Sequence, residues 1–192
     1  VQLGLEDKKI ILYIGTFETY QGLGLLMEAC KTVFAEDEEA VLLMVGGSPE
    51  QVEATKQEAE EMGIGGQCRF TGTVPHKEVP GFLKVADVLV SPRRFGTNTP
   101  LKIYSYLRSG TPIVATNLYT HTQVLSPEVS ILTDVDPIAF AEGILKVLSD
   151  TQLGEELTEK AFQLSEKEYS YNKYTEKTKS VYDHIEQVIE NV

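Results

Sequence analysis

One loop of this sequence has the residue types that bind small anions. It covers residues 91–100, Ser-Pro-Arg-Arg-Phe-Gly-Thr-Asn-Thr-Pro, between the apolar run Val88–Val90 and a helix expected to start near Leu101. The polar residues Thr97–Thr99 are of the types that cap helices, and the first N–H groups of a helix carry a partial positive charge that attracts phosphate. The loop is therefore a candidate phosphate site, although an ordinary capped helix between two strands would show the same pattern.

The elements that position this loop follow from the pattern of apolar residues. Six short apolar runs alternate with helical stretches, which is typical of a parallel sheet covered by helices on both faces. The predicted strands are Ile10–Ile14, Ala40–Val45, Cys68–Thr71, Val88–Val90, Ile113–Ala115 and Val129–Leu132. Ser48, with Pro49 and Gln51 after it, predicts a helix start with a capping box. We expect a single Rossmann-like α/β domain over residues 1–192, with its last helices in 151–192.

The strand order decides which loops meet. Right-handed crossovers between six strands give most simply the doubly wound order 3-2-1-4-5-6, in which the sheet reverses between strands one and four. Ligands bind such sheets outside the carboxyl ends of the strands at that reversal. Gly15, Thr16 and Phe17 follow the first strand, and the 91–100 loop follows the fourth. We therefore expect these two segments to form the walls of one crevice, where Gly15 permits close approach of a ligand to the backbone.

The charge of the chain limits what this crevice binds. The 192 residues include 17 lysines and arginines against 29 aspartates and glutamates, a formal net charge of -12. Nucleic acids and anionic lipid surfaces are bound by clustered Lys and Arg, so neither is expected as a partner, and any phosphate must be small and locally held. No apolar stretch approaches the roughly 20 residues of a membrane span, and no signal peptide opens the sequence. We predict a cytoplasmic protein, cut from a longer chain.

Motifs for the common cofactors are missing. A nicotinamide dinucleotide site would have G-x-G-x-x-G after the first strand, whereas Gly15 is followed only at a distance by Gly22 and Gly24. There is no P-loop motif either. The histidines and cysteines of the chain are His76, His121, His184, Cys30 and Cys68. The histidines lack metal-ligand spacing, and both cysteines are of the kind expected as buried thiols, so we expect neither a metal nor a cofactor.

Seven short motifs occur in an order that one known family shares. They lie at residues 14–16, 23–29, 45–50, 70–75, 86–92, 109–116 and 136–137. Over nearly the whole chain they resemble the C-terminal half of the family-4, group 1 glycosyltransferases of GT-B fold. The resemblance implies a domain that binds a nucleotide-diphosphate sugar and transfers the sugar with retention of configuration and without a metal. It also implies that a glycan or lipid acceptor is bound by an N-terminal domain absent from this chain; any membrane association of the full protein is not encoded here.

Two glutamates of that family are not matched. The resemblance implies a ribose-binding glutamate and, eight residues before it, a glutamate near the sugar. Counting back from Gly110 places these positions at Ser105 and Thr97. A subset of the family has a loop similar to Asn98–Lys102, usually with glutamate where Ser105 stands. A serine donates one hydrogen bond to a ribose hydroxyl where a carboxylate accepts two, a loss of about 1 to 3 kcal/mol.

The phosphate-binding Arg and Lys of the usual family loop are not matched either. Thr16 and Gln21 stand at their positions. Arg93, Arg94 and Lys102, with the helix N-terminus, are then the candidates to neutralise phosphate charge, and each of them equally fits a plain surface charge. The candidate catalytic groups are Thr97, Lys102 and Arg94.

Further positions carried over from the resemblance concern the base and the sugar. Val74 matches the position whose backbone pairs with the base, and His76 lines the same pocket. The segment Thr120–Gln123 replaces a Gly-Gly-x-x-Glu stretch that covers the donor, which makes its last three residues candidate sugar or phosphate contacts, namely His121, Thr122 and Gln123. The residues predicted to bind the nucleotide or its phosphates are Gly15, Thr16, Val74, Thr97, Asn98, Thr99, Leu101 and Ser105.

The sequence thus favours the donor domain of a retaining glycosyltransferase of hexosyltransferase type, inactive as a fragment. Two alternatives stay open. The missing glutamates of the family also fit a non-catalytic relative that serves as a structural or partner-binding module, and a nucleotide-sugar epimerase has the same two-domain fold.

Overall fold

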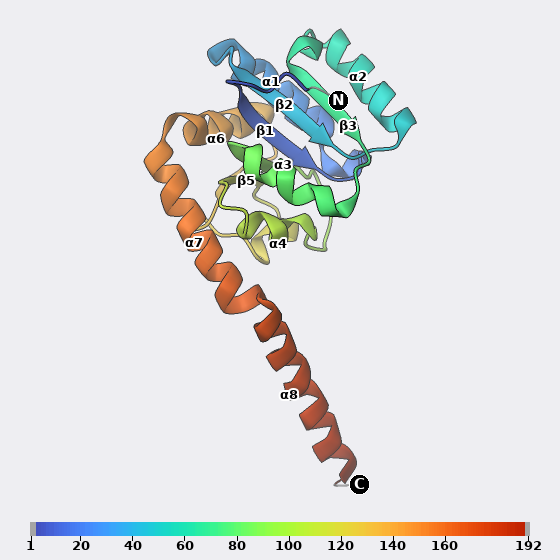
Figure 1. Ribbon diagram of the computed structural model, residues 1–192, viewed down its shortest axis with the longest axis vertical. Coiled ribbons are helices and arrows are strands. Elements are labelled where there is room, and N and C mark those ends of the chain that lie inside the picture. The colour runs from blue at the N-terminus through green and yellow to red at the C-terminus, as the bar shows by residue number, and fades with distance from the viewer. Residues whose placement is uncertain (1–2, 191–192) are drawn as a thin grey trace.

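The six apolar runs form one parallel sheet in the computed structural model, which describes residues 3–190 (Figure 1). Its order is β3-β2-β1-β4-β5-β6, as the crossover rule predicts. The strands are β1 Lys9–Ile14, β2 Ala40–Val45, β3 Cys68–Gly72, β4 Val88–Ser91, β5 Ile113–Thr116 and β6 Ile131–Thr133. β6 starts two residues later than predicted because the N–H groups of Val129 and Ser130 both donate to the carbonyl of Ser126 at 3.1 Å, which makes a turn there.

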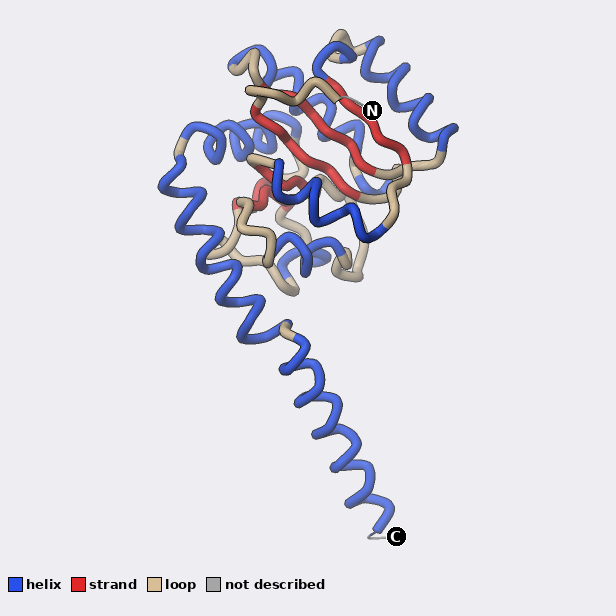
Figure 2. Tube along the Cα trace, viewed as in Figure 1, coloured by secondary structure: helices blue, strands red, loops and turns tan. Residues whose placement is uncertain are grey.

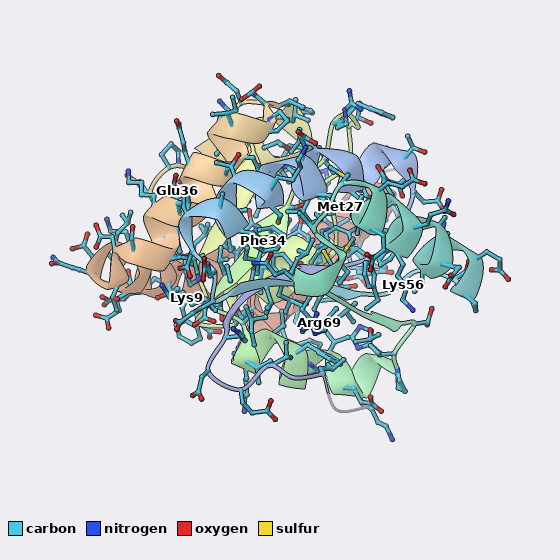
Figure 3. The ribbon with its side chains drawn as sticks, turned by 90° about the horizontal axis from the view of Figure 1, so that it is seen from above. Lys9, Met27, Phe34, Glu36, Lys56 and Arg69 are labelled. Carbon is cyan, nitrogen blue, oxygen red and sulfur yellow. The ribbon has the colours of Figure 1, made fainter. Side chains whose placement is uncertain are left out.

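Helices cover both faces of this sheet (Figure 2). They are α1 Leu23–Glu36, α2 Pro49–Glu61, α3 Val79–Val85, α4 Lys102–Leu107, α5 Tyr119–Thr122, α6 Pro137–Ser149, α7 Thr151–Tyr169 and α8 Tyr171–Glu190, with short 3-10 turns at Thr19–Gln21, Gly65–Gln67 and His76–Glu78. One core cluster joins α1, α2 and α6 to the sheet, and a second joins α3, α4 and α7 to its other face. Met27 and Phe34 of α1, labelled in Figure 3, belong to the first cluster, whereas Glu36 is exposed.

The last helix stands apart from these layers. Figure 1 shows α8 leading away from the sheet at the end of α7. One extended residue, Ser170, separates the two helices. Several large apolar side chains of α8 are exposed, namely Tyr171, Tyr174, Val181, Tyr182, Ile185, Val188 and Ile189. Among residues 3–190, no helix combines the length and apolar composition of a membrane-spanning segment.

Candidate functional site

The turn after β1 and the loop after β4 lie against each other where the sheet reverses. The N–H of Arg94 donates to the carbonyl of Tyr20 at 3.2 Å. A Cβ on Gly22, which has φ +78°, would overlap the carbonyl oxygen of Pro92. Since β1 pairs in parallel with β4, both segments leave the sheet at its carboxyl edge. The expectation that the two segments meet at the carboxyl edge of the sheet is therefore confirmed, and their junction is called the crevice below.

The polar residues of the β4 loop do not cap the next helix. α4 begins at Lys102, and its N-cap is Leu101, which makes no side-chain cap hydrogen bond. The predicted capping by Thr97–Thr99 is therefore wrong. The physical reason is that other side chains hold the loop backbone: Gln123 Nε2 donates to the carbonyl of Thr97 at 2.8 Å, and Arg93 Nη1, from the start of the same loop, donates to that of Asn98 at 2.9 Å.

The backbone N–H groups in the middle of the same loop are unpaired. The carbonyl of Asn98 accepts a second hydrogen bond, from Thr120 Oγ1. Within the part of the chain that the structure describes, the N–H groups of Thr97, Asn98 and Thr99 donate no hydrogen bond. Thr97 and Asn98 are exposed and Thr99 is half-buried. The loop therefore has fixed carbonyls and three free amides, which is an arrangement suited to bind an anion.

Arg93 is the residue that fixes this loop. Its side chain is only 4% exposed, and its guanidinium lies 5.2 Å from the ring centroid of Tyr20 in the turn after β1. Nη1 donates to the Asn98 carbonyl and, at 2.9 Å, to Thr120 Oγ1, whereas Nε has no partner. None of the ion pairs among residues 3–190 includes Arg93. Its positive charge is therefore buried without a carboxylate.

Lys102 brings a second cation to the crevice. Its ammonium lies 4.0 Å from the ring centroid of Tyr13, and Nζ is buried without a hydrogen-bond partner. A Cβ on Gly15 would lie 3.5 Å from this Nζ. Burial, and then the nearby charge of Arg93, lower the pKa of Lys102 to about 7. Of the three cations predicted here, Arg93 and Lys102 thus both lie near the end of β1, against Tyr20 and Tyr13 respectively.

Arg94 lies elsewhere. It is exposed, and together with Glu18 and Glu58 it lines a cavity of about 360 Å³ between the turn after β1 and α2. Its Cγ would be 3.3 Å from a Cβ on Gly22. The structure therefore does not bring Arg94 together with Lys102, although both were predicted as candidate catalytic groups.

His121 is buried behind the loop rather than in the crevice, with no exposed surface. Its Nδ1–H donates to the Thr116 carbonyl at 2.8 Å, so Nε2 accepts from the Ser91 hydroxyl, also at 2.8 Å. Thr116 Oγ1 in turn donates to the carbonyl of Arg93 at 2.7 Å. These partners could not be read from the sequence pattern, because their only signal is a small polar residue at the end of each buried strand. His121 thus supports the residue that fixes the loop.

The buried imidazole predicts a pH dependence of stability. Burial lowers the pKa of His121 to about 4, against about 6.5 in the unfolded chain. The unfolded state therefore binds more protons between these values, and stability falls as the pH falls through this range. From pH 7 to pH 5 we expect wild type to lose about 2 kcal/mol more than His121→Gln in urea unfolding. His184→Gln, at an exposed position of α8, should behave as wild type; equal losses for wild type and His121→Gln would contradict this role.

The other predicted positions lie along the same carboxyl edge. Thr16 is exposed and accepts a 3.3 Å hydrogen bond from Gln21 Nε2. Val74 is half-buried just after β3. Ser105 is exposed on α4, beside Tyr106, whose hydroxyl accepts from the N–H of Ile14 at 3.2 Å. The remaining exposed candidates are His76, Leu101, Thr122 and Gln123.

Metal-binding clusters and disulfides are not found in this part of the molecule. Across residues 3–190, no three His, Cys, Asp or Glu side chains are grouped to hold a metal ion. Cys30 and Cys68 are buried free thiols, which confirms the prediction for both.

Comparison with known proteins identifies the family. A family model described as "Glycosyl transferases group 1" matches residues 1–164. The chain belongs to the group 1 glycosyl transferases. A curated relative, "Putative glycosyltransferase YtcC" of Bacillus subtilis, is 26% identical over 193 residues, which cover 95% of this chain and 47% of the relative. This group 1 chain thus spans about half the length of the curated relatives it matches.

Solved structures of other proteins share the fold. Anabaena Alr3699/HepE, whose structure is described as a complex with UDP, has a TM-score of 0.81 at 15% identity; the match covers 100% of this chain and 51% of that one. The C-terminal domain of a glycosyl transferase group 1 family protein, LpcC from Francisella tularensis, has a TM-score of 0.74 at 16% identity, covering 85% of this chain and 87% of that one. The family-model match confirms the resemblance of the sequence motifs to group 1, and these structures confirm the expected fold.

Proposed function

We propose that this domain binds a nucleotide-diphosphate sugar in the crevice between the turn after β1 and the loop after β4. The observation that carries the proposal is the loop of Thr97–Thr99, whose amides are free while its carbonyls are clamped, at the reversal point of the sheet. The group 1 membership and the UDP complex of a relative with the same fold support it.

The proposed chemistry is electrostatic. In our proposal the amides of Thr97–Thr99 donate to the diphosphate and stabilise the charge that develops on it as the sugar leaves. Donors fixed in place before the reaction need no reorganisation, which is why they favour such a charged state. An acceptor, a glycan or a lipid, would be bound by a further domain, and the sugar would be transferred with retention and without a metal. The domain alone would then bind the donor but transfer nothing.

Binding measurements test this proposal. Calorimetric titration with UDP, GDP and their sugars should show binding of one base in preference to the other, and uridine or guanosine without phosphate should bind at least tenfold more weakly, because the charge-assisted contacts are to phosphate. If neither nucleotide bound at millimolar concentration, the non-catalytic alternative would be favoured. That alternative has one observation behind it, since Thr97 and Ser105 are both exposed and uncharged. The group 1 match favours a transferase over an epimerase.

The ribose position has its own test. If Ser105 on α4 faces the ribose, Ser105→Glu should tighten nucleotide binding about tenfold, because a carboxylate accepts hydrogen bonds from two hydroxyls. Ser105→Gln, which has nearly the same size without the charge, should gain much less. Calorimetry with the preferred nucleotide measures both variants, and an unchanged affinity of Ser105→Glu would place the ribose elsewhere.

A further inference from the structure

Unused hydrogen-bonding atoms gather at the crevice. Four buried side-chain polar atoms have no partner among residues 3–190, and three of them lie in or next to the crevice segments: Gln21 Oε1, Arg93 Nε and Lys102 Nζ; the fourth is Ser165 Oγ in α7. An unpaired buried polar group lowers stability, so natural proteins keep few of them without a reason. Two of these three atoms, Arg93 Nε and Lys102 Nζ, are hydrogen-bond donors, the kind of group from which an anion accepts.

The charges around Lys102 indicate the sign of the charge on a ligand bound there. The Tyr13 ring of β1 lies against its ammonium, and the groups whose charges interact with it are Arg93 after β4 and His121 in α5, which is neutral. No carboxylate is among the groups that shift the pKa of Lys102, and none of the ion pairs in the described chain includes it. A buried ammonium beside a second cation lacks a counter-charge, and an anion would supply it.

Gly15 brings the backbone after β1 close to the ammonium of Lys102. A Cβ there would lie 2.8 Å from Tyr13 Oη and 3.5 Å from Lys102 Nζ. A side chain at this position would therefore overlap the Tyr13 hydroxyl and crowd the ammonium, and glycine avoids both contacts. Gly15 is half-buried directly after β1, so the ammonium lies next to the crevice in which we place the donor.

We propose that Lys102 is a proton-linked anion ligand, which binds a phosphoryl oxygen of the donor beside Gly15 and takes up one proton from solvent as the anion binds. The assignment rests on the proposed function of the crevice. Burial and the charge of Arg93 oppose protonation of Lys102 in the free protein, whereas a bound phosphoryl oxygen favours it. Binding of the anion and protonation of the amine therefore strengthen each other.

The sign of the pH effect follows from this linkage. The pKa of Lys102 in the free protein is about 7, and the bound anion raises it. Above pH 7 the free protein has lost the proton that the complex requires, so affinity falls as the pH rises. A nucleotide-diphosphate sugar should bind about 20-fold more weakly at pH 8.5 than at pH 6.5, because each pH unit well above the free pKa is a factor of about ten.

Calorimetry in two buffers of different ionisation enthalpy measures the proton directly. With UDP-glucose or GDP-mannose, whichever wild type binds, we expect uptake of close to one proton at pH 8. Lys102→Met should abolish the uptake and the pH dependence, and should raise the melting temperature because the unpaired buried charge is gone. Lys102→Arg keeps a permanent charge, so it should bind with no pH dependence. Lys84→Met, at an exposed position of α3, should match wild type throughout.

The outcomes separate this inference from the proposed function. Binding of the nucleotide sugar by wild type without proton uptake, or an unchanged pH profile in Lys102→Met, would overturn the role of Lys102 and leave the donor site standing. Failure of wild type to bind any nucleotide sugar, while pyrophosphate binds wild type more tightly than Lys102→Met at pH 6.5, would overturn the proposed function and keep the anion site. If Lys102→Met bound pyrophosphate as wild type does, the anion site would be refuted.

Discussion

Replacement of Gly22 by alanine is expected to lower the free energy of unfolding by about 3 to 5 kcal/mol, since the new Cβ adds steric overlap to an unfavourable φ. Gly22 has φ +78°, and its Cβ would overlap the Pro92 carbonyl oxygen. The turn after β1 and the loop after β4 would have to separate, so nucleotide binding should be lost as well. Urea unfolding followed by circular dichroism measures the change in stability.

Gly63 provides a matched control. It has φ +76°, close to that of Gly22, but nothing lies within 4 Å of the Cβ position. Gly63→Ala should therefore cost only the backbone strain, about 1 to 2 kcal/mol. Equal losses for the two variants would show that the close contact between the two segments does not matter for stability.

Replacement of Arg93 by methionine is expected to weaken binding of the preferred nucleotide sugar about 100-fold, because two charge-assisted hydrogen bonds that fix the loop are lost. Methionine fills much of the same space, so the fold should persist while the Asn98 carbonyl and Thr120 hydroxyl lose their shared donor. The amides of Thr97–Thr99 would then no longer be held in place. Calorimetry at pH 6.5 measures the affinity, and the melting temperature reports on the fold.

The neighbouring arginine shows whether position or charge matters. The variant Arg94→Met removes the same charge as Arg93→Met. However, Arg94 is exposed, and its side chain makes no hydrogen bond that holds the loop. Arg94→Met should weaken binding less than threefold, the effect of a screened surface charge. If both variants lost affinity equally, the loss would reflect a general attraction between positive charge and the anion, and not the hydrogen bonds by which Arg93 holds the loop.

The fold was predictable because its signals are local. Continuous apolar runs of strand length indicate buried parallel strands, and the crossover rule then leaves few strand orders. Ser48 and Gln51 show how little context is needed: the Ser48 hydroxyl accepts from the Gln51 N–H, and the Gln51 side chain accepts from the Ser48 N–H, as the sequence spacing predicts. Each of these signals is contained in a few consecutive residues or in the alternation of elements.

The details of the site depended on contacts between distant residues. The cap predicted at Thr97–Thr99 failed because Arg93, Thr120 and Gln123 bind the loop carbonyls instead, and two of these three lie beyond the next strand. The inward direction of Lys102 requires the ring of Tyr13, which is far away in sequence. Spacing along the chain identifies the polar residues, but it does not determine which of them turn into the interior.

The backbone conformation of Ser170 sets the direction of the last helix relative to α7. Because this one residue joins α7 to α8, its two backbone dihedrals set the direction of the whole helix, which at 1.5 Å per residue is about 30 Å long. A rotation of about 10° there would swing the far end through about 5 Å. Small backbone adjustments near Tyr169, which stacks edge-on against Tyr104 of α4, would thus be amplified several-fold at the tip, as at the end of a lever.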